Sequence, residues 1–306
     1  MGVLAPGVRP VSALRATLTR ARPSRRAATR NRQAWSRSAL LLTGVRVAVA
    51  AVFSFPLYWM LVTATGPKGR AYILPPRLIP GTNFSAFATV INGTDWAHYM
   101  LNSTLISGLT ILLVLCTCSL AGYALVAFPL RGKGVLFIVL IGALLLPEQA
   151  LIIPQYVVNY HLGLLNTYAV MIIPFAANSS SVFLFRQYFA SMPPEWREVA
   201  QVEGVGTMAY MRRVALPTAK PVVLTVVLLT FISSWNQFQW PLIMTTNPLI
   251  APIELALNQY QNAFEESQRT LAAVSLLALL PIVIVFAIAQ RHIVRAVVGV
   301  DTGVEE

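Results

Sequence analysis

Apolar residues in this chain gather into six long stretches separated by short polar segments. The stretches run approximately over residues 41–64, 101–127, 134–154, 167–189, 219–243 and 270–290. Each is close to the roughly 20 residues that an α-helix needs to cross a bilayer. The pattern therefore predicts an all-α integral membrane protein with six transmembrane helices. Pro56, Pro147, Pro174 and Pro281 lie inside these spans, where they would bend the helices.

The longest charged segment between two apolar stretches runs from residue 190 to 218. Pro193 and Pro194 open it and Glu195 follows at once, which is typical of a helix start with an acid at the positive end of the dipole. Gly204 then breaks the helix, and a second short helical run leads to Leu216 and Pro217. The segment is predicted to be a helical hairpin outside the bilayer, between the fourth and fifth spans.

The first helix of this hairpin carries a short apolar ridge. Trp196, Val199, Ala200 and Glu203 fall at positions i, i+3, i+4 and i+7, so they share one helix face that is edged by charge. A ridge of this kind on an exposed helix indicates a protein partner, although an ordinary amphipathic loop is the simpler alternative.

Charge placement orients the predicted spans. The chain is 56% hydrophobic and only 11% charged, with a net charge of +12 and a mean hydropathy of +0.65, which excludes an ordinary soluble domain. Nine Arg and no acid precede Leu40, and the hairpin adds further basic residues on the same side. By the positive-inside rule, the hairpin and both termini are expected in the cytoplasm. We therefore interpret the basic residues as setting the orientation of the chain in the membrane, and not as forming a surface that binds nucleic acid.

This placement gives a domain plan. Residues 1–38 are expected to be a disordered basic cytoplasmic tail lying on anionic membrane lipid, with an organelle transit peptide as the alternative. Residues 39–296 form the six-helix membrane domain, and residues 297–306 form a short cytoplasmic tail. Lys68, Arg70, Arg77 and Arg269 would lie on the outer side.

Three short motifs in the hairpin resemble a known family. Glu198-x-Ala200, then Glu203-Gly204, then Leu216-Pro217 look like the cytoplasmic loop that marks the membrane subunits of binding-protein-dependent ABC importers. The family pattern has Ala, Asp and Ala where this chain has Val199, Glu203 and Val205. These departures are conservative.

The resemblance extends over most of residues 40–300 and is closest to the carbohydrate branch, as in the smaller maltose-type permease. Ser234-Trp235-Asn236-Gln237-Phe238 and Trp240-Pro241-Leu242 carry it most clearly. One departure is Ala127, where the family usually has Arg at the end of the second helix, so a cytoplasmic ion pair is expected to be missing.

The resemblance implies a permease subunit of an importer that moves a sugar or sugar derivative across the bacterial cytoplasmic membrane by alternating access. Its partners would be a homologous second permease, a cytoplasmic ABC ATPase dimer and an extracytoplasmic substrate-binding protein. The residues expected to dock the ATPase are Trp196, Glu198, Val199, Ala200, Glu203, Gly204 and Pro217. The chain itself would bind no cofactor, because ATP would be held by the partner.

Polar residues within the fourth and fifth spans are candidates for the translocation path. They are Asn178, Ser179, Trp235, Asn236, Gln237 and Gln239. A buried amide in lipid needs either a partner or a wet cavity, so interhelical hydrogen bonding is the alternative role. Neutral amides and hydroxyls beside an aromatic ring suit a sugar.

Glu148, beside Pro147, is the one acid within an apolar run and is a candidate gate. A proton- or ion-coupled secondary transporter is the competing function, but it would need more ionisable groups in the membrane and internal repeats. The sequence lacks a phosphate-binding glycine loop followed by Lys and Ser or Thr, and its three His are scattered without metal-ligand spacing. We therefore expect neither an enzyme nor a metal site.

Overall fold

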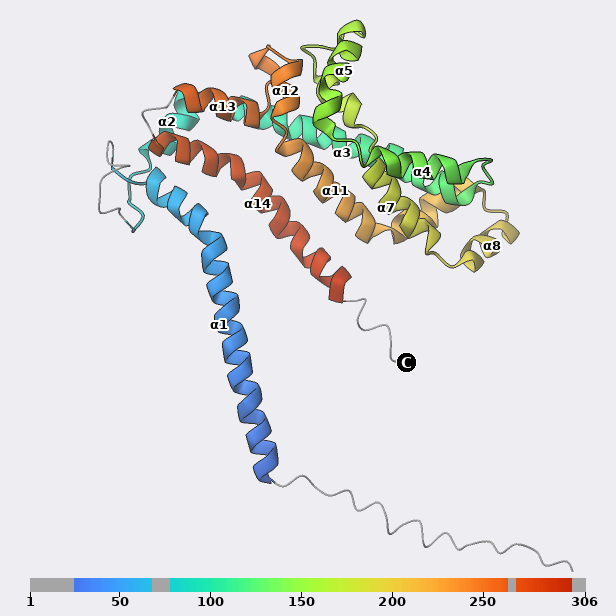
Figure 1. Ribbon diagram of the computed structural model, residues 1–306, viewed down its shortest axis with the longest axis horizontal. Helices are drawn as coiled ribbons and strands as arrows, with labels where there is room; N and C mark the ends of the chain where they lie inside the picture. Colours follow the sequence, from blue (N-terminus) through green and yellow to red (C-terminus); the bar gives the residue numbers. More distant parts are fainter. Residues whose placement is uncertain (1–24, 68–77, 264–267, 299–306) are drawn as a thin grey trace, which may run out of the picture. The chain divides into compact units, whose positions relative to one another are not determined.

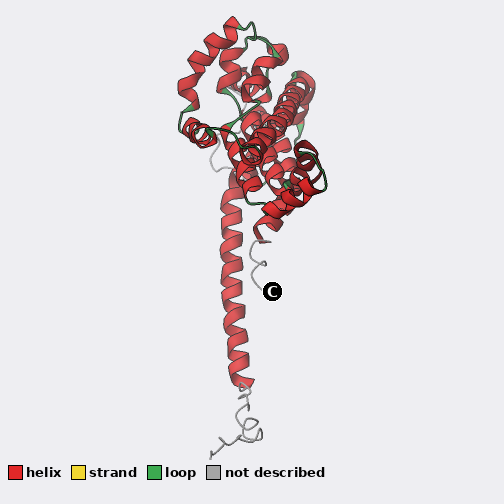
Figure 2. Ribbon diagram, turned by 90° about the vertical axis from the view of Figure 1, so that its right-hand side faces the viewer, coloured by secondary structure: helices red, strands yellow, loops and turns green. Residues whose placement is uncertain are grey.

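The computed structural model describes residues 25–67, 78–263 and 268–298 of the 306 residues. All regular elements among these residues are helices (Figure 2), which confirms the predicted all-α class. Residues 1–58 and 59–306 form two compact units, and each is described by itself. Residues 1–24 of the predicted basic tail and residues 299–306 of the predicted C-terminal tail lie outside the described residues.

The helices fall at the following positions. In the first half of the chain they are α1 (Arg25–Ala64), α2 (Ser85–Gly93), α3 (Trp96–Ala127), α4 (Lys133–Ala143), α5 (Glu148–His161), α6 (Tyr168–Ile172), the 3-10 turn η2 (Ile173–Phe175) and α7 (Ser179–Ala190). In the second half they are α8 (Pro194–Val202), α9 (Thr207–Tyr210), the π-helical turn η3 (Met211–Ala215), α10 (Leu216–Thr218), α11 (Lys220–Trp235), α12 (Gln239–Met244), the 3-10 turn η4 (Pro248–Ile250), α13 (Ile253–Ala263) and α14 (Gln268–Val298).

Within the described residues, three helical segments are long and apolar enough to cross a membrane, namely residues 39–64, 96–127 and 268–290. The other predicted spans are bent pairs of helices. α4 and α5 meet at 103°, the α6–η2 segment and α7 at 40°, and the α9–α10 segment and α11 at 76°. Length and composition allow up to six spans if each bent pair crosses as one unit. The third pair, however, includes residues 207–218, which the sequence analysis placed in the hairpin outside the bilayer. Pro147 and Pro174 lie at or next to two of these bends. Proline favours a bend there because it cannot donate a backbone hydrogen bond.

The long helix α3 is the axis of the second unit. Its main neighbours are α7 and α11 (Figure 1), and its approach to α7 depends on Gly122. A Cβ atom built on Gly122 would lie only 2.7 Å from Cβ of Phe185, so only glycine fits between these two backbones. Small residues of this kind let membrane helices approach each other closely.

Two core clusters lie near opposite ends of α3. One contains Tyr123, Phe185 and Phe189 together with Tyr210 of α9, and the other contains Tyr99 together with residues such as Trp235 of α11. Figure 1 shows α8 close to one end of α3 and α13 close to the other end. We refer to them below as the α8 end and the α13 end.

At the α13 end, Asn102 and Ser103 of α3 hold the loop that leads into α13. Asn102 Nδ2 donates hydrogen bonds to the carbonyl oxygens of Leu249, at 3.0 Å, and Ala251, at 2.9 Å. Ser103 Oγ accepts a hydrogen bond of 2.8 Å from the backbone N–H of Ile253. These side chains pair backbone groups of an irregular segment, which would otherwise be buried without partners.

Arg269, at the start of α14, is only 7% exposed. Its Nε donates to the carbonyl oxygen of Ala64, at 3.1 Å, and its Nη2 contacts Asn83 Oδ1 at 2.9 Å and Ser85 Oγ at 2.7 Å. These acceptors are neutral, and one of them is the last carbonyl of α1, where a helix dipole favours a cation. Arg269 therefore joins the end of the first span to the start of α2.

Candidate functional site

The helix α8 begins and ends where the sequence pattern predicts. Pro193 is its N-cap, Pro194 is its first residue and Glu195 is in its first turn. At its other end Gly204 has a positive φ of 74°. The N–H of Gly204 bonds the carbonyl of Gln201 at 3.1 Å, and the N–H of Val205 bonds the carbonyl of Ala200 at 2.8 Å. This pair of bonds is a Schellman motif, in which glycine takes the left-handed position at low cost.

The predicted ridge on α8 divides into two parts in the structure. Trp196 is 48% exposed, Val199 is 61% exposed and the neighbouring Val202 is 89% exposed. Ala200 instead packs against the core cluster that contains Tyr123 and Phe185. The large apolar side chains therefore form an exposed surface, which we call the α8 apolar surface and define as Trp196, Val199 and Val202.

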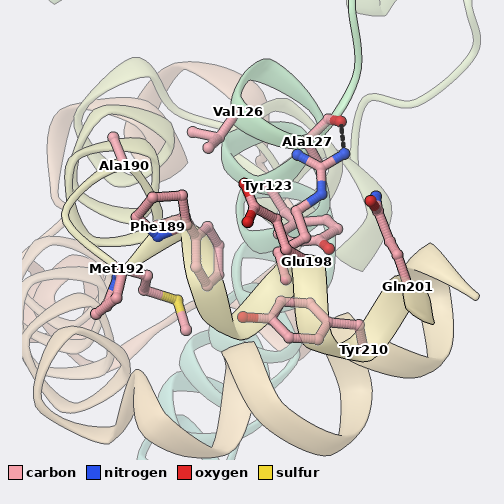
Figure 3. A pocket seen from close by; sticks show the side chains of 12 residues that line it. Tyr123, Val126, Ala127, Phe189, Ala190, Met192, Glu198, Gln201 and Tyr210 are labelled. Atoms are coloured by element: carbon pink, nitrogen blue, oxygen red, sulfur yellow. Dashed lines mark hydrogen bonds between the residues drawn. The ribbon is translucent and has the colours of Figure 1, made fainter. Parts of the chain in front are cut away.

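Arg197 joins α8 to the end of α3. Its Nη2 donates a hydrogen bond to the carbonyl oxygen of Ala127, the last residue of α3 (Figure 3). The last carbonyls of a helix lack intrahelical partners and carry a partial negative charge, so a guanidinium suits this place. The sequence analysis did not single out Arg197, because nothing local relates it to a residue 70 positions away.

A cavity of about 510 Å³ lies between α8 and residues of α3, α7 and α9. It is lined from α3 by Tyr123, Val126 and Ala127, from α7 by Phe189 and Ala190, from the following turn and α8 by Met192, Pro193, Pro194, Arg197, Glu198 and Gln201, and from α9 by Tyr210. In Figure 3, Phe189 and Met192 lie on one side of this space and Gln201 on the other. The predicted docking residue Glu198 thus lies at the cavity and is exposed.

The second arm of the hairpin contains the π-helical turn η3, followed by α10 with Pro217 at its second position. Tyr123 OH of α3 donates to the carbonyl of Thr207, at 3.3 Å. Tyr188 OH of α7 donates to the carbonyl of Thr218, at 2.6 Å, just before the bend into α11. Both ends of this arm are therefore tied to the bundle, and π-turns are frequent at functional sites.

Two of the predicted path residues lie at the break between η2 and α7. Asn178 is the N-cap of α7, and its Oδ1 accepts a hydrogen bond of 2.8 Å from the N–H of Ser181. Ser179 is the first residue of α7 and is partly exposed. The amide of Asn178 therefore has a structural role at the start of a helix that begins within a predicted span.

The other predicted path residues surround the end of α11. Trp235 is 1% exposed and its Nε1 donates to the carbonyl of Ala278 on α14, at 3.3 Å. Asn236 is the C-cap of α11 and is exposed, as is Gln239 at the start of α12, whereas Gln237 is partly buried.

Trp240 of α12 connects the break that follows α11 to the break between η2 and α7. Its Nε1 donates to the carbonyl of Val170 on α6, at 2.9 Å, and its ring meets that of Phe175 edge-on with 5.1 Å between centroids. Trp240 was quoted in the sequence motif but was not among the path candidates. The structure therefore joins the two halves of the candidate path through an aromatic side chain.

Glu148 is the first residue of α5 and is exposed. It follows the N-cap Pro147, where the dipole of a helix favours an acid. This local role accounts for its place in an apolar run. His98 also has a local contact, since its Nε2 lies 2.6 Å from the carbonyl oxygen of Leu249. Among the described residues, no three potential ligands are grouped as a metal site.

Comparison with known proteins finds a family and several relatives that this chain resembles. Residues 119–299 match the model of the family described as binding-protein-dependent transport system inner membrane component. The probable ABC transporter permease protein YurM of Bacillus subtilis is 29% identical over 250 residues, which cover 80% of this chain and 82% of YurM. The sn-glycerol-3-phosphate transport system permease protein UgpE of Escherichia coli K12 is 30% identical over 259 residues, covering 81% of this chain and 92% of UgpE. A chain of a bacterial ABC transporter that imports the acidic polysaccharide alginate superposes with a TM-score of 0.73 at 21% identity, covering 86% of this chain and 97% of that chain.

Proposed function

The chain belongs to the family of binding-protein-dependent transport system inner membrane components, and we propose that it is the permease subunit of an ATP-driven importer for a sugar or sugar derivative. The observation that carries this proposal is α8, which presents its apolar surface outside the bundle. A helix with Trp196, Val199 and Val202 exposed would be unfavourable in water unless a partner covered it.

The partner of this surface is a cytoplasmic ABC ATPase. The chain has no phosphate-binding loop of its own, so the energy for transport comes from a separate subunit. Glu195, Glu198 and Glu203 border the apolar surface and are exposed, which favours a recess with basic residues at its rim. This side of α8 faces the cytoplasm, as the distribution of basic residues indicates.

Two further partners complete the importer. A second, homologous permease would complete the pathway through the membrane, and an extracytoplasmic binding protein would deliver the substrate. ATP binding would close the ATPase dimer and move α8, and the helices would switch between an inward-open and an outward-open state.

The substrate class follows from the breaks between η2 and α7 and between α11 and α12. Helices interrupted within the membrane commonly form substrate sites in transporters. The side chains at these breaks that are at least partly exposed are neutral, namely Asn178, Ser179, Asn236, Gln237 and Gln239. Amides and hydroxyls of this kind suit the hydroxyl groups of a sugar. The permease UgpE is named for sn-glycerol 3-phosphate transport, and the transporter with the similar fold imports the polysaccharide alginate. Both compounds carry hydroxyl groups, as a sugar derivative does.

The experiment is purification of the tagged chain from native membranes in mild detergent, followed by mass spectrometry of the bound proteins. We expect an ABC ATPase and a second permease. The variant Val202→Glu, which places a charge on the α8 apolar surface, should lose the ATPase. Gln201→Glu adds the same charge at the cavity and should retain it. Recovery of the chain alone would contradict the proposal and favour an ion-coupled secondary transporter, in which Glu148 would be a candidate gate.

A further inference from the structure

The two ends of α3 are held by side-chain contacts of different kinds. At one end the carbonyl of Ala127 accepts a hydrogen bond from Arg197 of α8. At the other end Asn102 and Ser103 bind the loop between Leu249 and Ile253. These contacts place α3 between the helix that would meet the ATPase and a loop near the opposite end of the bundle.

We propose that Arg197 is a positioning residue that couples movement of α8 to α3, and that α3 carries this movement to the Leu249–Ile253 loop. This inference rests on the proposed function, since the ATPase would supply the movement. It adds a residue and a route through the structure that connect the two faces of the membrane.

The continuity of α3 makes it suited to this role. It is a single helix of 32 residues, about 48 Å long at a rise of ~1.5 Å per residue, and it contains no proline. The neighbouring bent pairs change direction by 40° to 103°. A continuous helix transmits a displacement along its axis, whereas a break allows the two halves to move separately.

Arg197 makes the polar part of the connection between α8 and α3. No residue of α8 is buried, so apolar packing holds this helix less firmly than it holds α3 and α7, which both have buried residues. Ala200 contributes a contact with the core. All residues of α8 are described, and among their side chains it is Arg197 that hydrogen-bonds another helix, at the carbonyl of Ala127 on α3. Its planar guanidinium fixes direction as well as distance, so a change in the position of α8 displaces the end of α3.

The loop at the other end is held closely enough to respond. The carbonyl of Leu249 accepts from Asn102 Nδ2 at 3.0 Å and lies 2.6 Å from His98 Nε2, and both residues belong to α3. The Asn102 amide is itself fixed, because its Oδ1 accepts a hydrogen bond of 2.8 Å from Tyr168 OH. The Leu249 side chain is 66% exposed, so a reporter can replace it while the backbone carbonyl remains.

The test measures the response of this loop to ATP in the complex purified from membranes. The chain carries Leu249→Cys labelled with an environment-sensitive fluorophore, and Cys116→Ser and Cys118→Ser remove the native thiols. In the otherwise unchanged chain, addition of MgATP with vanadate is expected to change the fluorescence. Arg197→Gln should abolish this change, and Arg197→Lys, which keeps a cationic donor, should restore part of it. Arg212→Gln, at an exposed arginine of the hairpin, should leave it unchanged.

The ATPase that purifies with each variant separates this inference from the proposed function. If no ATPase accompanies the unchanged chain, the proposed function fails. If the ATPase is bound and the fluorescence change is intact in Arg197→Gln, the role of Arg197 is overturned. If Arg197→Gln loses the ATPase, Arg197→Lys decides the matter: a restored fluorescence change supports the role, and an absent change with the ATPase bound overturns it.

Discussion

Gly122 of α3 lies directly against Phe185 of α7, so closely that a Cβ atom on Gly122 would be 2.7 Å from Cβ of Phe185 and 2.9 Å from the backbone nitrogen of Arg186. Neither neighbour is the end of a flexible side chain. The two helices would therefore have to separate to admit any larger residue.

Gly122→Ala should lower stability by about 1–3 kcal/mol, the usual cost of overpacking a close contact. Gly108→Ala is the matched control on the same helix, because a Cβ atom there meets no atom within 4 Å. The midpoint of thermal unfolding in detergent should fall for Gly122→Ala and stay unchanged for Gly108→Ala. Equal midpoints for the two variants would show that α3 and α7 can move apart freely.

Gly204→Ala should weaken the end of α8 because of the backbone conformation that residue 204 must adopt, and not because the added methyl group lacks space. The positive φ of 74° costs a residue with a Cβ atom about 1–2 kcal/mol, although the space around Gly204 is open. We expect insertion into the membrane to persist while transport per ATP hydrolysed falls. Gly206→Ala is the control, because Gly206 has an ordinary φ of −64°. Unchanged transport in Gly204→Ala would exclude a need for the Schellman motif.

Arg269→Ala should destabilise the junction between the first span and α2. It leaves the carbonyl of the buried Ala64 without this donor, at a cost of about 1–3 kcal/mol for an unsatisfied buried group. It also releases Asn83 and Ser85, which are exposed and can bind water instead. Faster protease cleavage within residues 78–85 would report the loss. Arg212→Ala removes an exposed arginine and should change the rate little, so similar cleavage in both variants would rule out the role of Arg269.

Glu254, in the first turn of α13, should make the stability of the folded chain depend on pH. Burial raises the pKa of its carboxyl above the ordinary value of 4.5, so the folded chain binds a proton more readily than the unfolded chain. The burial penalty is therefore fully present above the raised pKa and is relieved as the pH falls through it. Glu254→Gln should raise the thermal midpoint at neutral pH, and the gain should shrink on acidification. A gain that does not vary with pH would contradict this cause.

Much of the hairpin could be predicted because its signals are local. The two prolines and Glu195 mark the start of α8, and Gly204 marks its end, since capping depends on residues within one turn. The bend at Pro147 follows from the same kind of rule. The fold class could be predicted too, because a bilayer admits few alternatives to helices.

The contacts between distant segments could not be predicted in this way. The sequence analysis expected an ion pair to be missing at Ala127, but it gave no sign that Arg197, from another helix, would bind the carbonyl of that residue. Trp235 was assigned to the path from its polar surroundings, whereas its ring is buried and its N–H bonds α14. Periodicity indicates which face of a helix is apolar, but not which helix covers that face.

If Arg197 couples α8 to α3 as proposed, the cavity beside α8 would make the response of the hairpin depend on the direction of the applied force. Along α3, force on α8 meets the hydrogen bond from Arg197 to Ala127 and a continuous helix behind it. Toward the cavity of about 510 Å³, α8 would have no packed neighbour to resist the same force. A displacement of α8 along α3 would therefore be passed on, whereas a displacement toward the cavity would not. The permease would then respond to the direction of the force applied to α8 as well as to its strength.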